Sequence, residues 1–341
     1  MPKTVAAFGE VMMRLQVPGH ELLAQSDTLK YSFSGTGVNV ISALSQFGHK
    51  GYLVSRLPDN PLGDAAAAYL RKLGIDTSKI LRGGSYLGMY FLENGFGIRP
   101  SRVTYSNRQE SSFNTAPDGV YPFEQTAGEM DAVHFCGITL AMNDGARRSM
   151  KEFAGQVKTQ GGLVIFDCNY RPGLWAANGG YAFAKPHYEA MLELADIVFM
   201  NEQDALHVLG MTSAAGKQER EELLEELIPV AAERYGVRTV AGTHRSLLED
   251  GRHSLRGYIY RDGRFSYSDV LVFPVHDRIG AGDAFASGII HGELEGFAPE
   301  RTVAFAAAAG MLAHTVTGDT PMASEAEVLR AMAQGLRDVE R

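Results

Sequence analysis

The stretch that decides the fold and the chemistry of this chain is Asp277-Arg278-Ile279-Gly280-Ala281-Gly282-Asp283-Ala284-Phe285. Two glycines so close together allow backbone conformations that a Cβ would penalise, so several N–H groups can point toward one spot. An Ala-rich helix follows, and the free N–H groups and dipole at a helix start attract anions. An aspartate beside such an anion hole suits phosphoryl transfer, which depends on positioning and charge stabilisation. The alternative interpretation is a glycine turn in which Asp283 only caps the helix.

Length and composition restrict the class of protein. The chain has 341 residues, 45% hydrophobic and 21% charged, as in ordinary globular proteins that form one large or two modest domains. A formal net charge of −8 argues against a nucleic-acid partner. Cys136 and Cys168 lie in apolar runs, which indicates reduced thiols in a cytoplasmic core. No signal peptide or membrane-spanning stretch is evident, so we expect no membrane association.

Apolar runs alternate with helical patterns through most of the chain. We expect strands at 4–8, 52–56, 132–136, 163–167, 196–200 and 237–241. We expect helices at 40–47, 61–73, 144–159, 181–194, 202–209, 219–235, 284–294, 299–314 and 325–336. This rhythm predicts an α/β fold with a parallel sheet and helices on both faces. A β-rich piece at 257–273 leads into the glycine motif.

Two further segments have strand-like pieces outside this rhythm, at about 11–33 and 86–113. In the second, aromatic residues and arginines are interleaved: Tyr90, Phe96, Arg99, Arg102, Tyr105 and Arg108. These segments predict a small β lid over a pocket, within one domain spanning 1–341. The alternative is a hairpin whose arginines face water. An exposed lid edge would suit a dimer interface, and we expect a homo-oligomer.

A second glycine-rich stretch, Ser34-Gly35-Thr36-Gly37-Val38-Asn39, precedes the 40–47 helix. A dinucleotide fingerprint would need a third glycine where Val40 stands, and no clear strand leads straight into this stretch. We therefore favour a backbone that approaches a small polyol, with Asn39 supplying a donor and an acceptor. The common signatures of P-loop NTPases, serine hydrolases and zinc proteases do not occur.

Polar side chains follow three of the expected strands, where ligands gather in parallel sheets. After the first, an extended chain would aim Asp167, Asn169 and Arg171 to one side, and Arg171 would clamp a carboxylate or phosphate; a strand-end salt bridge is the alternative. After the second, 201–204 (Asn-Glu-Gln-Asp) offers carboxylates for magnesium or simply a helix start. The third, 241–245, is a nucleotide-side loop candidate, whereas 314–319 is structural by default.

The two glycine motifs in this order are similar to those of the ribokinase-like (PfkB) family of sugar kinases. The early motif continues with Ala43, Leu44 and Gly48, and the late one with Gly288. The resemblance covers essentially the whole chain. It implies a three-layer αβα sandwich with a mostly parallel central sheet and a small β lid. It also implies that the 280–282 turn (Gly280, Ala281 and Gly282) forms the anion hole and that Asp283 is the catalytic base.

Within that family, several stretches resemble 2-keto-3-deoxygluconate kinases. They are 97–102 ahead of Tyr105, 167–172 running into Leu174-Trp175, His314-Thr315 before Gly318-Asp319, and the Asp277-Arg278 start. By that similarity the substrate side is lined by Gly35, Asn39, Tyr90, Tyr105, Arg108 and Arg171. We expect nucleotide contacts from Asn169, Asn201, Thr243, Arg245, Gly280 and Gly282. Asp204 is the expected contact to magnesium.

The resemblance implies ATP and Mg²⁺ as cofactors and a sugar acid as substrate. The expected reaction transfers the γ-phosphoryl group to the terminal hydroxyl of 2-keto-3-deoxygluconate. Because a helix N-terminus favours a carboxylate over its acid, we expect Asp283 to be ionised at neutral pH. The alternatives are a fructokinase or another sugar kinase of the same family, and a non-catalytic nucleotide or sugar sensor that keeps the fold.

Overall fold

The computed structural model describes residues 2–214, 216 and 219–333. A large sheet of ten strands forms its centre, in the order β13-β12-β11-β10-β9-β8-β1-β4-β5, with β14 paired to β12. The strands are β1 (Thr4–Phe8), β4 (Lys50–Leu57), β5 (Ile80–Arg82), β8 (Ala132–Cys136), β9 (Leu163–Asp167), β10 (Ile197–Phe199), β11 (Thr239–Leu247), β12 (His253–Arg261), β13 (Arg264–Tyr267) and β14 (Leu271–Phe273). Neighbours from β11 to β5 are parallel, whereas β12, β13 and β14 add an antiparallel edge.

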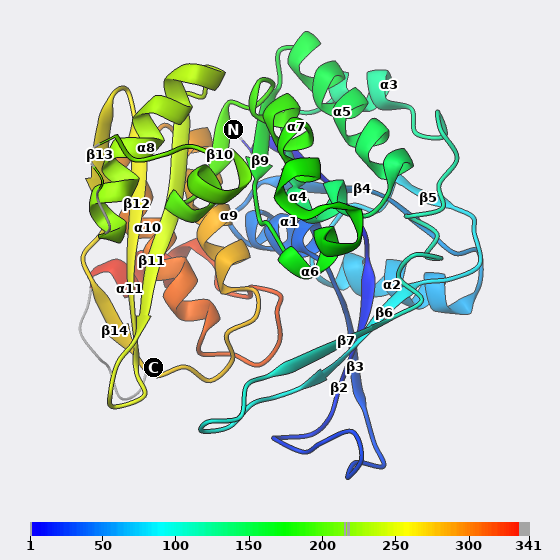
Figure 1. Ribbon diagram of the computed structural model, residues 1–341. Helices are drawn as coiled ribbons and strands as arrows, with labels where there is room; N and C mark the ends of the chain where they lie inside the picture. Colours follow the sequence, from blue (N-terminus) through cyan, green and yellow to red (C-terminus); the bar gives the residue numbers. More distant parts are fainter. Residues whose placement is uncertain (1, 215, 217–218, 334–341) are drawn as a thin grey trace.

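Helices cover both faces of this sheet (Figure 1). They are α1 (Thr36–Gln46), α2 (Pro61–Lys72), α3 (Phe123–Gly128), α4 (Gly137–Leu140), α5 (Asp144–Thr159), α6 (Pro172–Trp175), α7 (Gly180–Leu192), α8 (Arg220–Tyr235), α9 (Ala281–Glu295), α10 (Pro299–Ala313) and α11 (Glu325–Ala333). The expected α/β architecture is confirmed. No helix in the described ranges is both long and apolar enough to cross a membrane.

Two hydrophobic cores lie on opposite sides of the sheet, because side chains alternate along each strand. In β9, Val164 and Phe166 join the core that includes Phe153 of α5. Ile165, between them, joins the core that includes Phe285 of α9. Burial on both faces explains why these strands read as continuous apolar runs rather than alternating ones.

A second, four-stranded sheet projects from the layered body (Figure 1). Its order is β3-β2-β6-β7, formed by β2 (Met12–Gln16), β3 (Lys30–Ser34), β6 (Gly88–Glu93) and β7 (Arg102–Ser106). β3 runs directly into α1, so a strand does lead into the early glycine motif, contrary to our expectation. That strand pairs antiparallel with β2 in the small sheet, and therefore the motif is not the start of a parallel βαβ unit.

One local expectation differs in detail and two were wrong. The helix expected at 202–209 is present over residues 202–208, but Asp204–Val208 form a π-helical turn. The segment expected to be a loop, 241–245, lies inside β11, because it pairs with β12. The extended chain expected through 167–171 ends at Asp167, and Asn169 has a left-handed φ of 37°. The helix expected to reach residue 336 is described to Ala333, and its last three residues lie outside the described ranges.

Candidate active site

A cavity of about 620 Å³ opens where the parallel strands end. Its walls come from the chain after β1, β8, β9 and β10, from the starts of α1 and α9, and from the small sheet. Parallel strands bring their carboxyl ends to one edge, so residues distant in sequence meet there. Of the residues expected to form the site, all line this cavity except Ala281 and Arg245.

The turn that we expected to form an anion hole is built on Gly280. This residue is the N-cap of α9 with φ 85°, and a Cβ on it would lie 1.8 Å from the carbonyl oxygen of Asp319. A Cβ on Gly282 would meet no atom within 4 Å, which leaves free space at the helix start. Within the described part of the chain, the N–H groups of Ala281, Gly282 and Asp283 have no hydrogen-bond partner. The start of α9 is therefore equipped to bind an anion.

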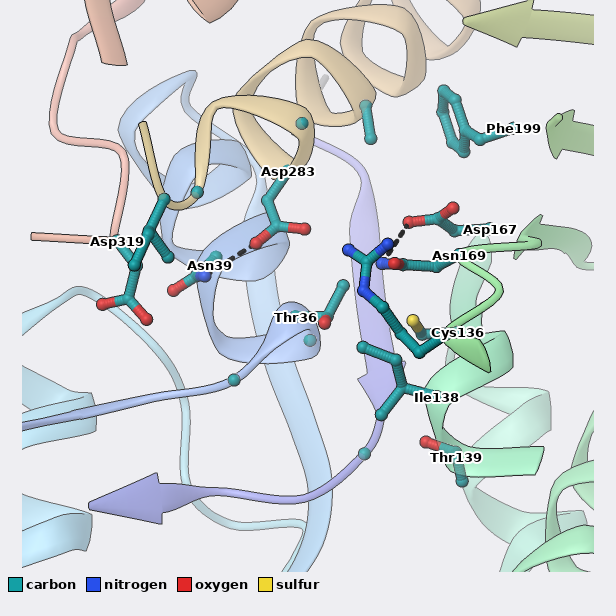
Figure 2. Close-up of a pocket in the computed structure, with 18 of the residues that line it drawn as sticks. Thr36, Asn39, Cys136, Ile138, Thr139, Asp167, Asn169, Phe199, Asp283 and Asp319 are labelled. Atoms are coloured by element: carbon teal, nitrogen blue, oxygen red, sulfur yellow. Dashed lines mark hydrogen bonds between the residues drawn. The ribbon is translucent and has the colours of Figure 1, made fainter. Parts of the chain in front are cut away.

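Asp283 is the third residue of α9 and not its cap, so the interpretation of this residue as a helix cap was wrong. Its Oδ2 accepts a hydrogen bond of 2.7 Å from Nδ2 of Asn39 on α1, as Figure 2 shows. Thr320 Oγ1 donates to the amide oxygen of Asn39 at 3.3 Å, which fixes the amide orientation. The two glycine motifs of the sequence thus meet at one carboxylate.

The surroundings of Asp283 act against the ionisation that we expected for it. Its burial, reinforced by the neighbouring carboxylates of Asp167 and Asp319, raises the pKa of Asp283 well above its ordinary value. Asn39 and Arg171 lower that pKa but do not offset the burial. Desolvation dominates here because the helix dipole contributes only a fraction of the cost of burying a charge. A carboxylate with a raised pKa is the stronger proton acceptor once it is ionised.

Two more carboxylates, both half-buried, lie at the ends of neighbouring strands: Asp167 is the last residue of β9, and Asp204 begins the π-helical turn after β10. Burial raises the pKa of Asp167 to about 6, and burial with repulsion from Asp167 raises the pKa of Asp204 to about 7. Asp167 accepts from Asn169 Nδ2 at 3.2 Å, across the cavity from Asp283 in Figure 2. Asp204 accepts from the N–H of Asn201 at 3.0 Å.

The carboxylates of Asp167 and Asp204 are suited to bind a divalent cation. A bound cation would offset the charge that burial disfavours on Asp167 and Asp204. Within the described ranges, no group of three or more His, Cys, Asp or Glu side chains could hold a metal. Mg²⁺ commonly takes only one or two carboxylates together with substrate phosphates, so two suffice. Asp167 was not among the metal contacts expected from the sequence.

Residues of the small sheet and of the chain after it form another wall of the cavity. Tyr90 and Tyr105 face each other across β6 and β7, with ring centroids 6.3 Å apart. The guanidinium of Arg108 lies 4.7 Å from the Tyr105 ring centre and donates from Nε to Glu10 Oε2 at 3.0 Å. Its Nη1 is buried without a hydrogen-bond partner in the described structure, so a donor remains for a ligand. The turn before α1 closes this wall, because a Cβ on Gly35 would lie 2.3 Å from the carbonyl oxygen of Glu10.

Two arginines, Arg245 and Arg278, lie close together on the remaining side. Arg278 lines the cavity from the loop before Gly280, and Thr243 of β11 lines it as well. Burial and the nearby positive charge of Arg278 lower the pKa of Arg245. Neither arginine forms an ion pair with another described residue. Two adjacent cations without an acidic partner suit a polyphosphate.

Sequence reasoning missed two carboxylates of the site. Asp319, expected to be structural, lines the cavity and accepts from the Tyr90 hydroxyl at 2.7 Å. Glu10 lines it as well and anchors Arg108. The signal for Glu10 was present, because only Gly9 separates it from the end of a buried strand. Asp319 had only its place after Gly318 at a helix end, a common surface pattern.

Comparison with known proteins places these observations in a family. The model of pfkB family carbohydrate kinases matches residues 2–246 and 252–326. A protein from Enterococcus faecalis named as a putative 2-keto-3-deoxygluconate kinase is 37% identical and superimposes with a TM-score of 0.94 over 99% of this chain and 98% of the other. The 2-dehydro-3-deoxygluconokinase of Thermotoga maritima is 32% identical with a TM-score of 0.92, over 98% and 99%. The 2-dehydro-3-deoxygalactonokinase of Haloferax volcanii is 29% identical over the full length of both chains.

Proposed function

The chain belongs to the pfkB family of carbohydrate kinases, and we propose that it transfers the γ-phosphoryl group of ATP to the terminal hydroxyl of 2-keto-3-deoxygluconate. The observation that carries the proposal is the carboxylate of Asp283, which lies beside the free N–H groups at the start of α9 and faces a cavity with arginines in its wall. The names of the relatives at 29–37% identity support the same substrate class.

Asp283 is proposed as the general base. It accepts the proton of the terminal hydroxyl while that oxygen bonds to the γ-phosphorus and the bond to ADP breaks. Asn39 holds the accepting carboxylate in place at 2.7 Å. The N–H groups of the 280–282 turn stabilise the charge that develops on the transferred group, because they need no reorientation during the reaction.

Selection of a sugar acid requires a cation near the sugar's carboxylate. Arg171 is exposed at the cavity and has no ion-pair partner among the described residues. Arg108, already held by Glu10 and Tyr105, offers its unpaired Nη1. We propose that these two guanidinium groups bind the carboxylate and the neighbouring keto oxygen. The aromatic wall of Tyr90 and Tyr105 excludes water, which would otherwise compete as acceptor.

The nucleotide is proposed to lie along Thr243, with its phosphates toward Arg245 and Arg278. Asn169 and Asn201 also line the cavity, and we propose that they contact the nucleotide. Asp167 and Asp204 would hold Mg²⁺, partly through water, and the ion supplies neutralisation of phosphate charge when bound.

The decisive experiment measures ADP release with the purified protein across a substrate panel. The panel contains 2-keto-3-deoxygluconate, its C4 epimer 2-keto-3-deoxygalactonate, fructose and ribose. We expect turnover on one or both sugar acids, at least tenfold above the neutral sugars in kcat/KM, and a 6-phosphate product by mass and ³¹P spectra. A preference for fructose would identify a fructokinase instead, and binding without turnover on any sugar would identify a sensor.

A further inference from the structure

A buried arginine on the lid contacts two aspartates on separate loops beside the anion hole. Arg14 of β2 donates from Nη2 to Asp277 Oδ2 at 3.2 Å, and its Nη1 lies 3.1 Å from Asp319 Oδ1. The arginine side chain is 2% exposed and each aspartate side chain 7%. Charges buried this deeply are costly unless they are paired, so the three groups depend on one another. The proposed chemistry uses no atom of Arg14.

Both aspartates are connected to the backbone of the anion hole. Asp277 Oδ1 accepts from the N–H of Ile279 at 3.1 Å, and its Oδ2 accepts from the N–H of Gly318 at 3.2 Å. Asp319 packs its carbonyl group directly against Gly280, where a Cβ would find no space. The Asp277 carboxylate therefore holds the chain just before Gly280 and the chain just before Asp319, while the backbone of Asp319 packs on Gly280 itself.

Arg14, Asp319 and the loop before Gly280 also contact other residues of the small sheet. Arg14 lies opposite Tyr90 in the pairing of β2 with β6, and the Tyr90 hydroxyl donates to the second oxygen of Asp319 at 2.7 Å. Ser34 of β3 shares a hydrogen bond of 3.1 Å with that hydroxyl. Ile279, directly before Gly280, packs on the lid cluster that includes Tyr90. Strands β2 and β6 of the small sheet thus contact the loop before Gly280, and β3 supports the Tyr90 hydroxyl.

We propose that Arg14 is a positioning residue that locks the lid to the anion-hole loop, so that the 280–282 N–H groups reach their phosphoryl-binding geometry only with the lid in place. A guanidinium suits this role because its planar fork binds two carboxylates at once, which a single ammonium cannot do. Without it, Asp277 and Asp319 would lose their common counter-ion in a dry site. The consequence is that the element covering the sugar also sets the phosphoryl site.

Removing Arg14 would also change the charge around the proposed base. Asp319 is one of the carboxylates that disfavour ionisation of Asp283, and Asp167 is another, while Arg171 favours it. Arg14 neutralises Asp319, so removing Arg14 exposes Asp283 to more negative charge. The pH at which activity rises should then move upward, a change that a general loss of packing would not produce.

The test compares Arg14→Met and Arg14→Lys with Arg148→Met, a control that breaks an arginine–aspartate pair at the surface. For Arg14→Met we expect a kcat loss of about a hundredfold, the scale of a small misplacement of catalytic groups, with a smaller change in the KM of the sugar acid. We expect the acid limb of its pH profile to move to higher pH. Hydrogen exchange should become faster in peptides covering 277–283 and 316–320, and Arg148→Met should match the wild type in each measurement.

Wild-type exchange in those peptides together with a wild-type kcat and pH profile in Arg14→Met would overturn the proposal. The kinetic readouts rest on the proposed function, but the exchange readout does not. If the wild type phosphorylates no sugar, the proposed function fails and exchange alone decides the role of Arg14. If Arg14→Met does not fold, Arg14→Lys decides, because unchanged exchange in that variant would show that binding both carboxylates is not required.

Discussion

Replacing Asp283 by Asn removes the proposed proton acceptor but keeps the shape of the side chain. The effects on catalysis and on stability can therefore be measured separately. The side chains have nearly the same shape, and the amide oxygen of the replacement can still accept from Asn39, which donates at 2.7 Å in the wild type. The variant therefore loses the proton acceptor while the surrounding packing and the N–H groups of the 280–282 turn remain. We expect a folded protein that binds its substrates and turns them over slowly.

The magnitudes follow from two different effects. General-base catalysis contributes about 10²- to 10⁴-fold, so kcat should fall by at least roughly a hundredfold, or about 2.7 kcal/mol of barrier. Stability should change in the opposite direction. Burial raises the folded-state pKa of Asp283, so the stability associated with its neutral form is fully present below the unfolded-state pKa and is lost as pH rises through the folded-state pKa. Because Asn stays neutral, the variant should be more stable than the wild type at pH 8, by on the order of 1 kcal/mol for each pH unit that separates the folded-state pKa from the unfolded-state pKa.

The assay combines steady-state kinetics with urea unfolding at pH 5 and pH 8, using the exposed Asp118→Asn as a control. The stability gain of Asp283→Asn should be larger at pH 8 than at pH 5. In the wild type, kcat/KM should rise with pH on the acid side and reach a plateau above the raised pKa. Near-normal turnover in the variant would refute Asp283 as the base. A variant that is less stable than the wild type at pH 8 would refute the argument from burial.

Three further substitutions test other parts of the site. Arg171→Met should lower kcat/KM for the sugar acid by roughly 10- to 100-fold, the scale of a lost charge-assisted hydrogen bond, with little effect on fructose; equal losses would mean that it does not read the carboxylate. Gly280→Ala should reduce kcat by about a hundredfold because its Cβ would lie 1.8 Å from a carbonyl oxygen, whereas Gly155→Ala, where a Cβ meets no atom, should be neutral in activity. Glu10→Ala should raise the KM of the sugar acid about tenfold by releasing Arg108, and an unchanged KM would place Arg108 outside the substrate site.

The sequence was sufficient for the architecture because its signals are local. Apolar runs of strand length and helical spacing recur along the chain, and burial on both faces makes the central strands apolar throughout. The turn at 280–282 was predictable for the same reason, since Gly280 needs a conformation that other residues rarely adopt. Local signals failed where pairing decided the outcome, as at 242–245, which became a strand because β12 lies beside it.

The chain before and after Gly280 best illustrates which properties the sequence determined and which depended on the tertiary structure. Sequence alone determined that this stretch forms a helix start with free N–H groups followed by a carboxylate, because glycine conformation and helix geometry are properties of neighbouring residues. Only the tertiary structure raised the pKa of that carboxylate, through burial and the charges of Asp167 and Asp319. Only the tertiary structure brought Arg14 to Asp277 and Asp319, across 263 and 305 positions of sequence. Charge interactions act through space, and spacing along the chain does not encode them.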